Sequence, residues 1–210
     1  MKFLLNILFP QRCVGCAARG SVICDPCAKK LQSAEAPKYS WITSIFSYKD
    51  SRVRALIRSL KYKHAKSIAD VLGVHLASSV SEFLGEEKLF LSGNILLVPV
   101  PLSRRRYRQR GYNQSELLAE ALVRELGAGN VSVDSGLVRK HADTKPQADI
   151  KNKNDRLRNL GDCFSATRKS HGESIVIIDD VTTTGATLVA LRRALKEKGF
   201  RNIHAFTIAH

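Results

Sequence analysis

The stretch that decides the fold is IVIIDDVTTTGAT, which covers residues 175–187. Its first four residues form a continuous apolar run, which is typical of a strand buried on both faces of a parallel sheet. Asp179 and Asp180 follow, and small residues then lead through Gly185 into a helical pattern. Because ligands of open α/β folds bind at the carboxyl edge of the sheet, the stretch predicts a ligand site at this turn.

The turn after the acid pair has the chemistry of a phosphate cradle. Backbone N–H groups and the dipole at the start of a helix bind anions. Small residues leave those amides open, and they are Thr182, Thr183, Thr184, Gly185, Ala186 and Thr187. Carboxylates repel phosphate, so Asp179 and Asp180 need another role, either to accept hydrogen bonds from sugar hydroxyls or to hold Mg2+. An ordinary strand–turn–helix with a fortuitous acid pair is the alternative.

This stretch resembles the thirteen-residue phosphoribosyl pyrophosphate (PRPP) signature of type I phosphoribosyltransferases. The resemblance implies that Asp179 and Asp180 contact the ribose hydroxyls. It also implies that residues 182–187 enclose the 5′-phosphate. The fold to expect is then a type I phosphoribosyltransferase-like α/β domain, with a mainly parallel sheet flanked by helices.

Strand and helix patterns alternate along the rest of the chain after residue 39, which also favours a doubly wound α/β sheet. We expect further strands at residues 41–48, 95–100, 137–139, 164–166 and 203–209. We expect helices after Asp50, at residues 68–84, between Asn113 and Gly127, and at residues 187–198. Residues 143–160 are polar and lysine-rich, and we expect them to be mobile.

Five arginines follow the expected strand at residues 95–100, within PLSRRRYRQRGYNQ at residues 101–114. Guanidinium groups match phosphate oxygens bidentately, so a loop here suits the pyrophosphate half of the ligand. The residues expected to contact pyrophosphate or nucleic acid are Pro101, Leu102, Ser103, Arg104, Arg105 and Arg106. Tyr107 and Tyr112 equally suit stacking on nucleic-acid bases. A solvated basic loop is the alternative.

Four of the five cysteines form two C-x-x-C pairs, Cys13 with Cys16 and Cys24 with Cys27. Two such turns can present four thiolates to one tetrahedral Zn2+ ion, which would be structural because it keeps no open position. Gly15 suits such a turn, because glycine tolerates the positive φ that these turns often require. Disulfides or redox-active pairs are the alternatives. We therefore expect a zinc-binding segment at residues 1–38 and a phosphoribosyltransferase-like domain at residues 39–210.

Cys163 stands apart from these pairs, before Phe164. Free cysteines are among the most buried residue types. We expect Cys163 to be a core or strand residue.

The charge balance favours a polyanionic partner, because 34 basic residues stand against 19 acidic ones and give a formal net charge of +15. A hydrophobic share of 44% excludes a disordered or fibrous chain. The apolar run in residues 1–10 is short and broken by Asn6, so we expect neither a secretion signal nor a transmembrane segment. A cytoplasmic protein is expected, with peripheral contact at the inner membrane left open.

Taken together, the motifs resemble the ComF family, whose members are associated with natural transformation or the use of external DNA. The motifs are the paired C-x-x-C, the P-L-x-R-R-R…R-G-Y-N-Q run, T-x-x-Q at residues 144–147 with R-x-x-N at residues 156–159, and the PRPP signature. The resemblance covers residues 10–210. It implies zinc at the four paired cysteines, a pyrophosphate loop near residues 101–104 and ribose-phosphate binding at residues 179–187.

Three functions fit these features. An enzyme would transfer the ribose phosphate of PRPP to a nitrogenous acceptor, with Asp179, Asp180 and Arg104 as catalytic residues and Mg2+ beside the leaving pyrophosphate. A non-catalytic protein would bind single-stranded DNA and use the site as a phosphate or ribose-phosphate sensor. A scaffold would dock DNA-uptake machinery on its zinc segment.

Overall fold

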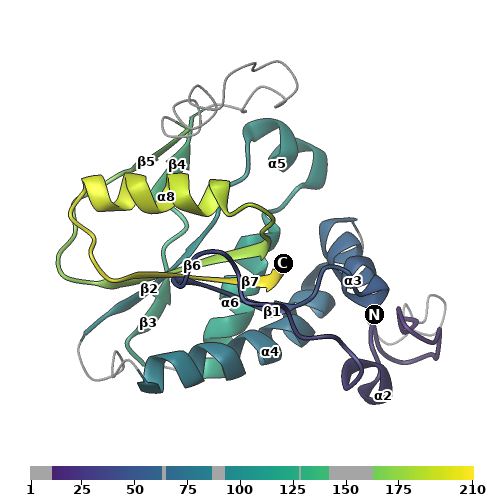
Figure 1. Ribbon diagram of the computed structural model, residues 1–210. Coiled ribbons are helices and arrows are strands. Elements are labelled where there is room, and N and C mark those ends of the chain that lie inside the picture. Colours follow the sequence, from purple (N-terminus) through teal and green to yellow (C-terminus); the bar gives the residue numbers. More distant parts are fainter. Residues whose placement is uncertain (1–10, 63–64, 87–92, 128, 142–162) are drawn as a thin grey trace.

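The computed structural model describes residues 11–62, 65–86, 93–127, 129–141 and 163–210 (Figure 1). The T-x-x-Q and R-x-x-N motifs lie outside these residues. The mobility expected for residues 143–160 concerns the same undescribed part of the chain.

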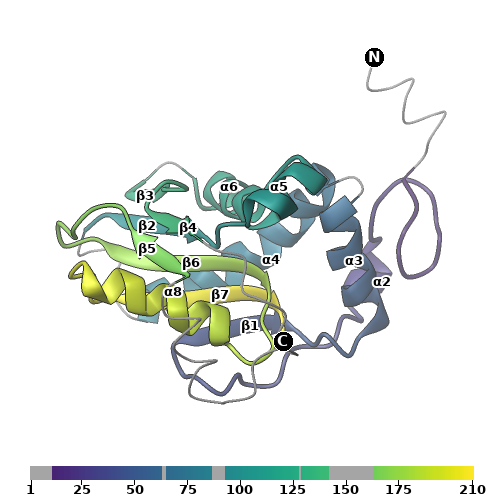
Figure 2. The same ribbon diagram turned by 90° about the horizontal axis from the view of Figure 1, so that it is seen from above.

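A five-stranded parallel sheet forms the centre of the molecule, in the order β1-β7-β6-β2-β3. Figure 2 shows β3 at one edge and β1 at the other. The strands are β1 (Ile42–Phe46), β2 (Ile95–Pro99), β3 (Val131–Val133), β6 (Ser174–Val181) and β7 (Ile203–Ala209). The predicted mainly parallel α/β fold is confirmed. The expected strand at residues 95–100 ends at Pro99, and it is an inner strand.

Helices cover both faces of the sheet (Figure 1). On one face lie α3 (Ser51–Tyr62), α4 (Ala65–Glu86) and α6 (Gln114–Leu126), and on the other lies α8 (Ala186–Glu197). Because successive strand residues point to opposite faces, Val176 and Ile178 pack in the cluster that contains α4 and α6, whereas Ile175 and Ile177 pack with α8. The apolar run predicted as a strand buried on both faces has this environment.

Side-chain caps explain where two of these helices begin. Asp50 precedes α3, and its Oδ1 accepts a hydrogen bond of 2.8 Å from the amide of Arg52. Asn113 precedes α6, and its Oδ1 accepts from the amide of Ser115 at 3.1 Å. Both caps were expected from the sequence. The described helices include none that could span a membrane.

Two short strands form a separate antiparallel pair beside the α8 face of the sheet. They are β4 (Val138–Lys140) and β5 (Phe164–Ala166). Cys163 immediately precedes β5 and is 3% exposed, as expected for a core residue. Strand β3 was not predicted from the sequence.

The packing of α4 against α6 depends on Gly73. A Cβ atom at Gly73 would lie 2.7 Å from the Cβ of Ala121, a separation that real structures do not adopt. Gly85 lies near the end of the same helix, and a Cβ atom there would meet nothing within 4 Å. Gly85 therefore provides a matched control for a substitution at Gly73.

We predict that Gly73→Ala lowers the free energy of unfolding and Gly85→Ala does not. Alanine favours a helix by about 1 kcal/mol over glycine, but at Gly73 the two helices must separate, which costs about 1–3 kcal/mol. Urea unfolding followed by circular dichroism measures both changes. A Gly73→Ala variant at least as stable as Gly85→Ala would contradict this account of the interface.

Candidate functional site

The acid pair lies at the carboxyl end of β6, in the middle of the sheet. Asp180 is 5% exposed and Asp179 is partly buried. The end of the neighbouring β2 is fixed beside them, because the amide of Val100 donates to the carbonyl of Ile178 at 2.9 Å. The two carboxylates therefore stand at the sheet edge where ligands of parallel α/β folds bind.

Helices α3 and α6 each supply one partner to this pair. The hydroxyl of Ser115, in the first turn of α6, donates to Asp179 Oδ1 at 3.0 Å. The ammonium of Lys61, in the last turn of α3, lies 2.7 Å from Asp180 Oδ2. Neither residue was selected from the sequence.

The environment of the pair favours a protonated Asp179. Burial raises the pKa of Asp179 from 3.8 to about 8, and the charge of Asp180 acts in the same direction. The amide of Asp180, the hydroxyl of Ser115 and the charge of Lys61 oppose this shift. Near pH 7 the pair therefore carries less negative charge than two ordinary aspartates would.

The loop after β6 leaves backbone donors open at the start of α8. The amide of Thr182 donates to Ala209 in β7, which anchors the loop to the sheet. Within the described part of the chain, the amides of Thr183, Thr184 and Gly185 have no hydrogen-bond acceptor. Thr183 and Thr184 are exposed. The predicted cradle residues Thr182, Thr183, Thr184, Gly185, Ala186 and Thr187 thus lie together, with unused donors among them.

Gly185 is required at the first position before α8 for two reasons. Its φ is +75°, in the left-handed region. A Cβ atom there would lie 3.1 Å from the ring of Tyr39, which precedes β1. The imidazole of His210 contacts the same loop, because its Nε2 donates to the carbonyl of Thr183 at 3.1 Å. Tyr39 and His210 were not predicted as site residues.

The arginine run forms a helix where we expected a loop. Helix α5 (Arg104–Arg110) begins after Ser103, whose hydroxyl accepts a hydrogen bond from the amide of Arg106 at 3.4 Å. It ends at Gly111, with φ +79°. Within residues 101–106 the side chains of Pro101 and Leu102 are partly buried, Ser103 is buried, and the three arginines are exposed. Because α5 follows β2, the run begins at the same sheet edge as the acid pair.

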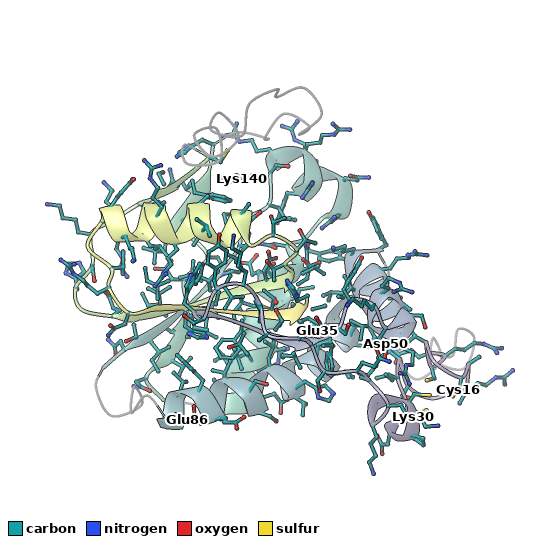
Figure 3. All side chains as sticks on the ribbon, in the orientation of Figure 1. Cys16, Lys30, Glu35, Asp50, Glu86 and Lys140 are labelled. Carbon is teal, nitrogen blue, oxygen red and sulfur yellow. The ribbon has the colours of Figure 1, made fainter. Side chains whose placement is uncertain are left out.

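The four paired cysteines converge near the amino-terminal end of the described chain. The sulfur atoms of Cys13, Cys16, Cys24 and Cys27 all lie within 4.8 Å of one another. Figure 3 shows Cys16 at the end of the molecule, beside further sulfur atoms. Around a tetrahedral zinc ion with bonds of about 2.3 Å, sulfurs stand roughly 3.8 Å apart. The Sγ of Cys24 is 3.6 Å from those of both Cys13 and Cys16, so this set fits such an ion.

Backbone geometry favours a thiolate at Cys13, whereas the hydrogen bond with Cys24 and burial raise the pKa of Cys27 to about 12. Burial opposes ionisation of Cys13, but backbone amides, including those of Cys24 and Gly15, lower its pKa to about 6. The expectation of a positive φ at Gly15 was wrong, because its φ is not in the left-handed region. Glycine is needed there for space, since a Cβ atom would lie 2.8 Å from Cys27 Sγ.

The cysteine segment is attached to the start of α3. Asp50 forms a 2.7 Å ion pair with Arg52, which holds the pKa of Asp50 at about 2. The guanidinium of Arg52 also donates to the carbonyl of Lys30, which follows α2 (Asp25–Ala28). Cys13 belongs to the same buried cluster as α3 and α4. Asp50, Lys30 and Cys16 lie at one end of the molecule in Figure 3.

Comparison with known proteins agrees with this geometry. A family model described as "Phosphoribosyl transferase domain" matches residues 113–210, which include the acid pair and the cradle. Competence protein ComFC of Bacillus subtilis (strain 168) is 32% identical over 168 residues, which cover 79% of this chain and 62% of the relative. The chain thus spans less than two thirds of that relative's length.

Two further relatives are covered more completely. DNA utilization protein YhgH of Escherichia coli (strain K12) is 32% identical over 174 residues, which cover 83% of this chain and 73% of the relative. Competence protein F of Haemophilus influenzae is 28% identical over 219 residues, which cover 98% of this chain and 93% of the relative. The chain therefore belongs to the ComF family of competence and DNA-utilization proteins, and carries a phosphoribosyl transferase domain.

Proposed function

We propose that this protein binds PRPP and transfers its phosphoribosyl group to a nitrogenous acceptor, in a pathway of DNA uptake or use of external DNA. One observation carries the proposal: two adjacent carboxylates stand next to backbone amides that have no acceptor among the described residues. A ligand with both hydroxyl groups and a phosphate satisfies both halves. Inorganic phosphate alone would leave the carboxylates without a role.

Each part of PRPP has a counterpart in the proposed site. Asp179 and Asp180 accept hydrogen bonds from the ribose hydroxyls, and residues 182–187 bind the 5′-phosphate. Residues 101–106 bind the pyrophosphate, with Arg104 stabilising it as it leaves. Mg2+ accompanies the pyrophosphate and neutralises part of its charge. Lys61 holds Asp180 in place through an ion pair of 2.7 Å to its Oδ2.

The relatives support the biological setting of this proposal. Two are named as competence proteins and one as a DNA utilization protein. A cytoplasmic place for the protein, with or without contact at the inner membrane, stays a prediction. So does an association with DNA-uptake machinery.

Exposed arginines favour a second candidate, a non-catalytic protein that binds single-stranded DNA. Arg104, Arg105 and Arg106 in α5 are exposed and adjoin the site. In that case the acid pair and the cradle would serve as a sensor for phosphate or ribose phosphate. Failure to release pyrophosphate from PRPP with any nucleobase or DNA acceptor would favour this candidate over the enzyme.

We further propose that Cys13, Cys16, Cys24 and Cys27 hold a structural Zn2+ ion. Their spacing and sulfur separations support it. Folding energy supplied by a metal would compensate for the small core of this segment.

The PRPP site is tested by calorimetric titration of PRPP with Mg2+. The wild type should bind saturably, and Asp179→Asn/Asp180→Asn should weaken binding by roughly 100-fold, because one hydrogen bond to a charged group contributes about 1.5–3 kcal/mol. Glu120→Gln/Glu125→Gln replaces two carboxylates by amides on the exposed surface of α6 and should bind as the wild type does. Absence of binding to a folded wild type would refute the proposed ligand.

The acid pair should make the stability of the protein without ligand dependent on pH. Folded Asp179 has a pKa of about 8 against 3.8 ordinarily, so the folded state holds a proton that the unfolded state releases. The contribution of this proton to the free energy of unfolding is complete below about pH 4, and it is lost as the pH rises to about 8. We predict that Asp179→Asn, which cannot ionise, melts higher than the wild type by on the order of 5 °C at pH 8.

The measurement is a series of thermal melts between pH 5 and pH 9. The gap between Asp179→Asn and the wild type should widen as the pH rises. Asp70→Asn, at an exposed carboxylate paired with Arg124, provides the control and should show no such widening. Parallel curves for Asp179→Asn and the wild type would contradict a raised pKa at Asp179.

The zinc site is tested by metal analysis of the purified protein. We predict zinc bound stoichiometrically in the wild type and in Cys163→Ser, and its loss in Cys24→Ser. Chelation should lower the melting temperature, because the metal stabilises only the folded state. Full zinc content in Cys24→Ser, or disulfides between the paired cysteines in the mass spectrum of the native protein, would exclude the proposed four-cysteine site.

A further inference from the structure

A groove runs beside α8, on the side of this helix that faces the segment before β1. One hollow is lined by Tyr39 and Trp41 together with Val189, Arg192, Arg193, Lys196 and Glu197 of α8. A second hollow, at the amino-terminal edge of β6 and β7, shares Trp41 and Arg192 with the first and adds Phe83, Arg201 and His204. In Figure 2, α8 lies over the β7 side of the sheet.

The helical wall of the groove is a basic stripe. Val189, Arg192, Arg193 and Lys196 occupy positions i, i+3, i+4 and i+7, which places them on one face of α8. With Arg201, the two hollows contain four basic side chains and one acidic one, Glu197. Arg193 pairs with that glutamate at 2.9 Å, in an exposed ion pair of low strength. The groove therefore carries a net positive charge.

Trp41 and Arg192 form the ridge between the two hollows. The Arg192 guanidinium lies over the indole of Trp41, 4.4 Å from the ring centroid. Its Nε is buried and has no hydrogen-bond acceptor among the described residues, and burial lowers the pKa of the group. A guanidinium in this state gains from an anionic acceptor. An aromatic surface beside it offers stacking.

We propose that this groove binds single-stranded nucleic acid. Bases stack on Trp41 and Tyr39, and backbone phosphates contact Arg192, Arg193, Lys196 and Arg201. Aromatic platforms flanked by basic side chains are the general means by which proteins hold unpaired strands. A duplex keeps its bases stacked inside and cannot use the aromatic rings.

This inference goes beyond the proposed PRPP site and differs from the DNA-binding candidate, which relied on α5. The groove does adjoin the cradle, because Tyr39 also lines the small cavity at residues 182–185. PRPP binding and oligonucleotide binding are separate titrations. Either can fail while the other succeeds, so their failures are distinguishable.

Trp41 makes the test specific, because it is the single tryptophan of the chain. Oligo(dT) of about eight nucleotides is titrated while tryptophan fluorescence and the anisotropy of a labelled oligonucleotide are recorded. Stacking of a base should quench Trp41 with the same midpoint as the rise in anisotropy. Trp41→Ala should weaken binding about tenfold and Trp41→Phe much less. Oligo(U) in parallel shows whether RNA or DNA is preferred.

A pair of double variants tests the phosphate contacts. Arg193→Ala/Lys196→Ala should lower the slope of log affinity against log salt by about 0.7 for each phosphate that is no longer neutralised. Arg124→Ala/Lys66→Ala also removes one ion-paired arginine and one lysine, but from exposed positions on α6 and α4, and should change little.

Three outcomes would overturn the proposal: no oligonucleotide binding, binding without a change in Trp41 fluorescence, or equal weakening in the two double variants. Loss of binding only in Arg105→Ala/Arg106→Ala would place the nucleic acid on α5 instead. Circular dichroism of each variant separates loss of binding from loss of folding.

Discussion

The close approach of two carboxylates at the end of a buried strand is the constraint on which the rest of the site depends. Asp179 and Asp180 are neighbours in sequence, and the sheet removes both from most of the surrounding water. Repulsion and desolvation act against such a pair. Ser115 and Lys61 offset part of that cost, so α3 and α6 must both be in place before the pair is stable. The helical layer on this face therefore shapes the site as well as the core.

Local sequence determined much of the architecture. The run at residues 175–187 predicted a two-face-buried strand, a turn and a helix, and β6 and α8 have these positions. Asp50 and Asn113 marked two helix starts correctly. Helix α5 was missed although its signals were present, since Ser103 caps it, Gly111 ends it, and arginine is a good helix former.

The contacts that complete the site could not be read from the sequence. Lys61 meets Asp180 across 119 positions of the chain, and Tyr39 meets Gly185 across 146. Such contacts depend on tertiary packing, which no local pattern encodes. The stack of Arg192 on Trp41 belongs to the same class. At Gly15 the sequence indicated that the turn needs glycine, but for a different reason. The residue is needed because a side chain would collide with the sulfur of Cys27, and its backbone is not left-handed.

Helix α3 contacts both the cysteine segment and the acid pair. At its start Arg52 donates to the cysteine segment, and in its last turn Lys61 contacts Asp180. Twelve residues of helix extend for about 18 Å, and a packed helix moves as a rigid rod. If occupancy of the cysteine cluster changes the position of α3, thermodynamic reciprocity requires that binding at the acid pair change metal affinity by the same factor. The helix thus provides a mechanical link through which the two proposed binding equilibria can influence each other.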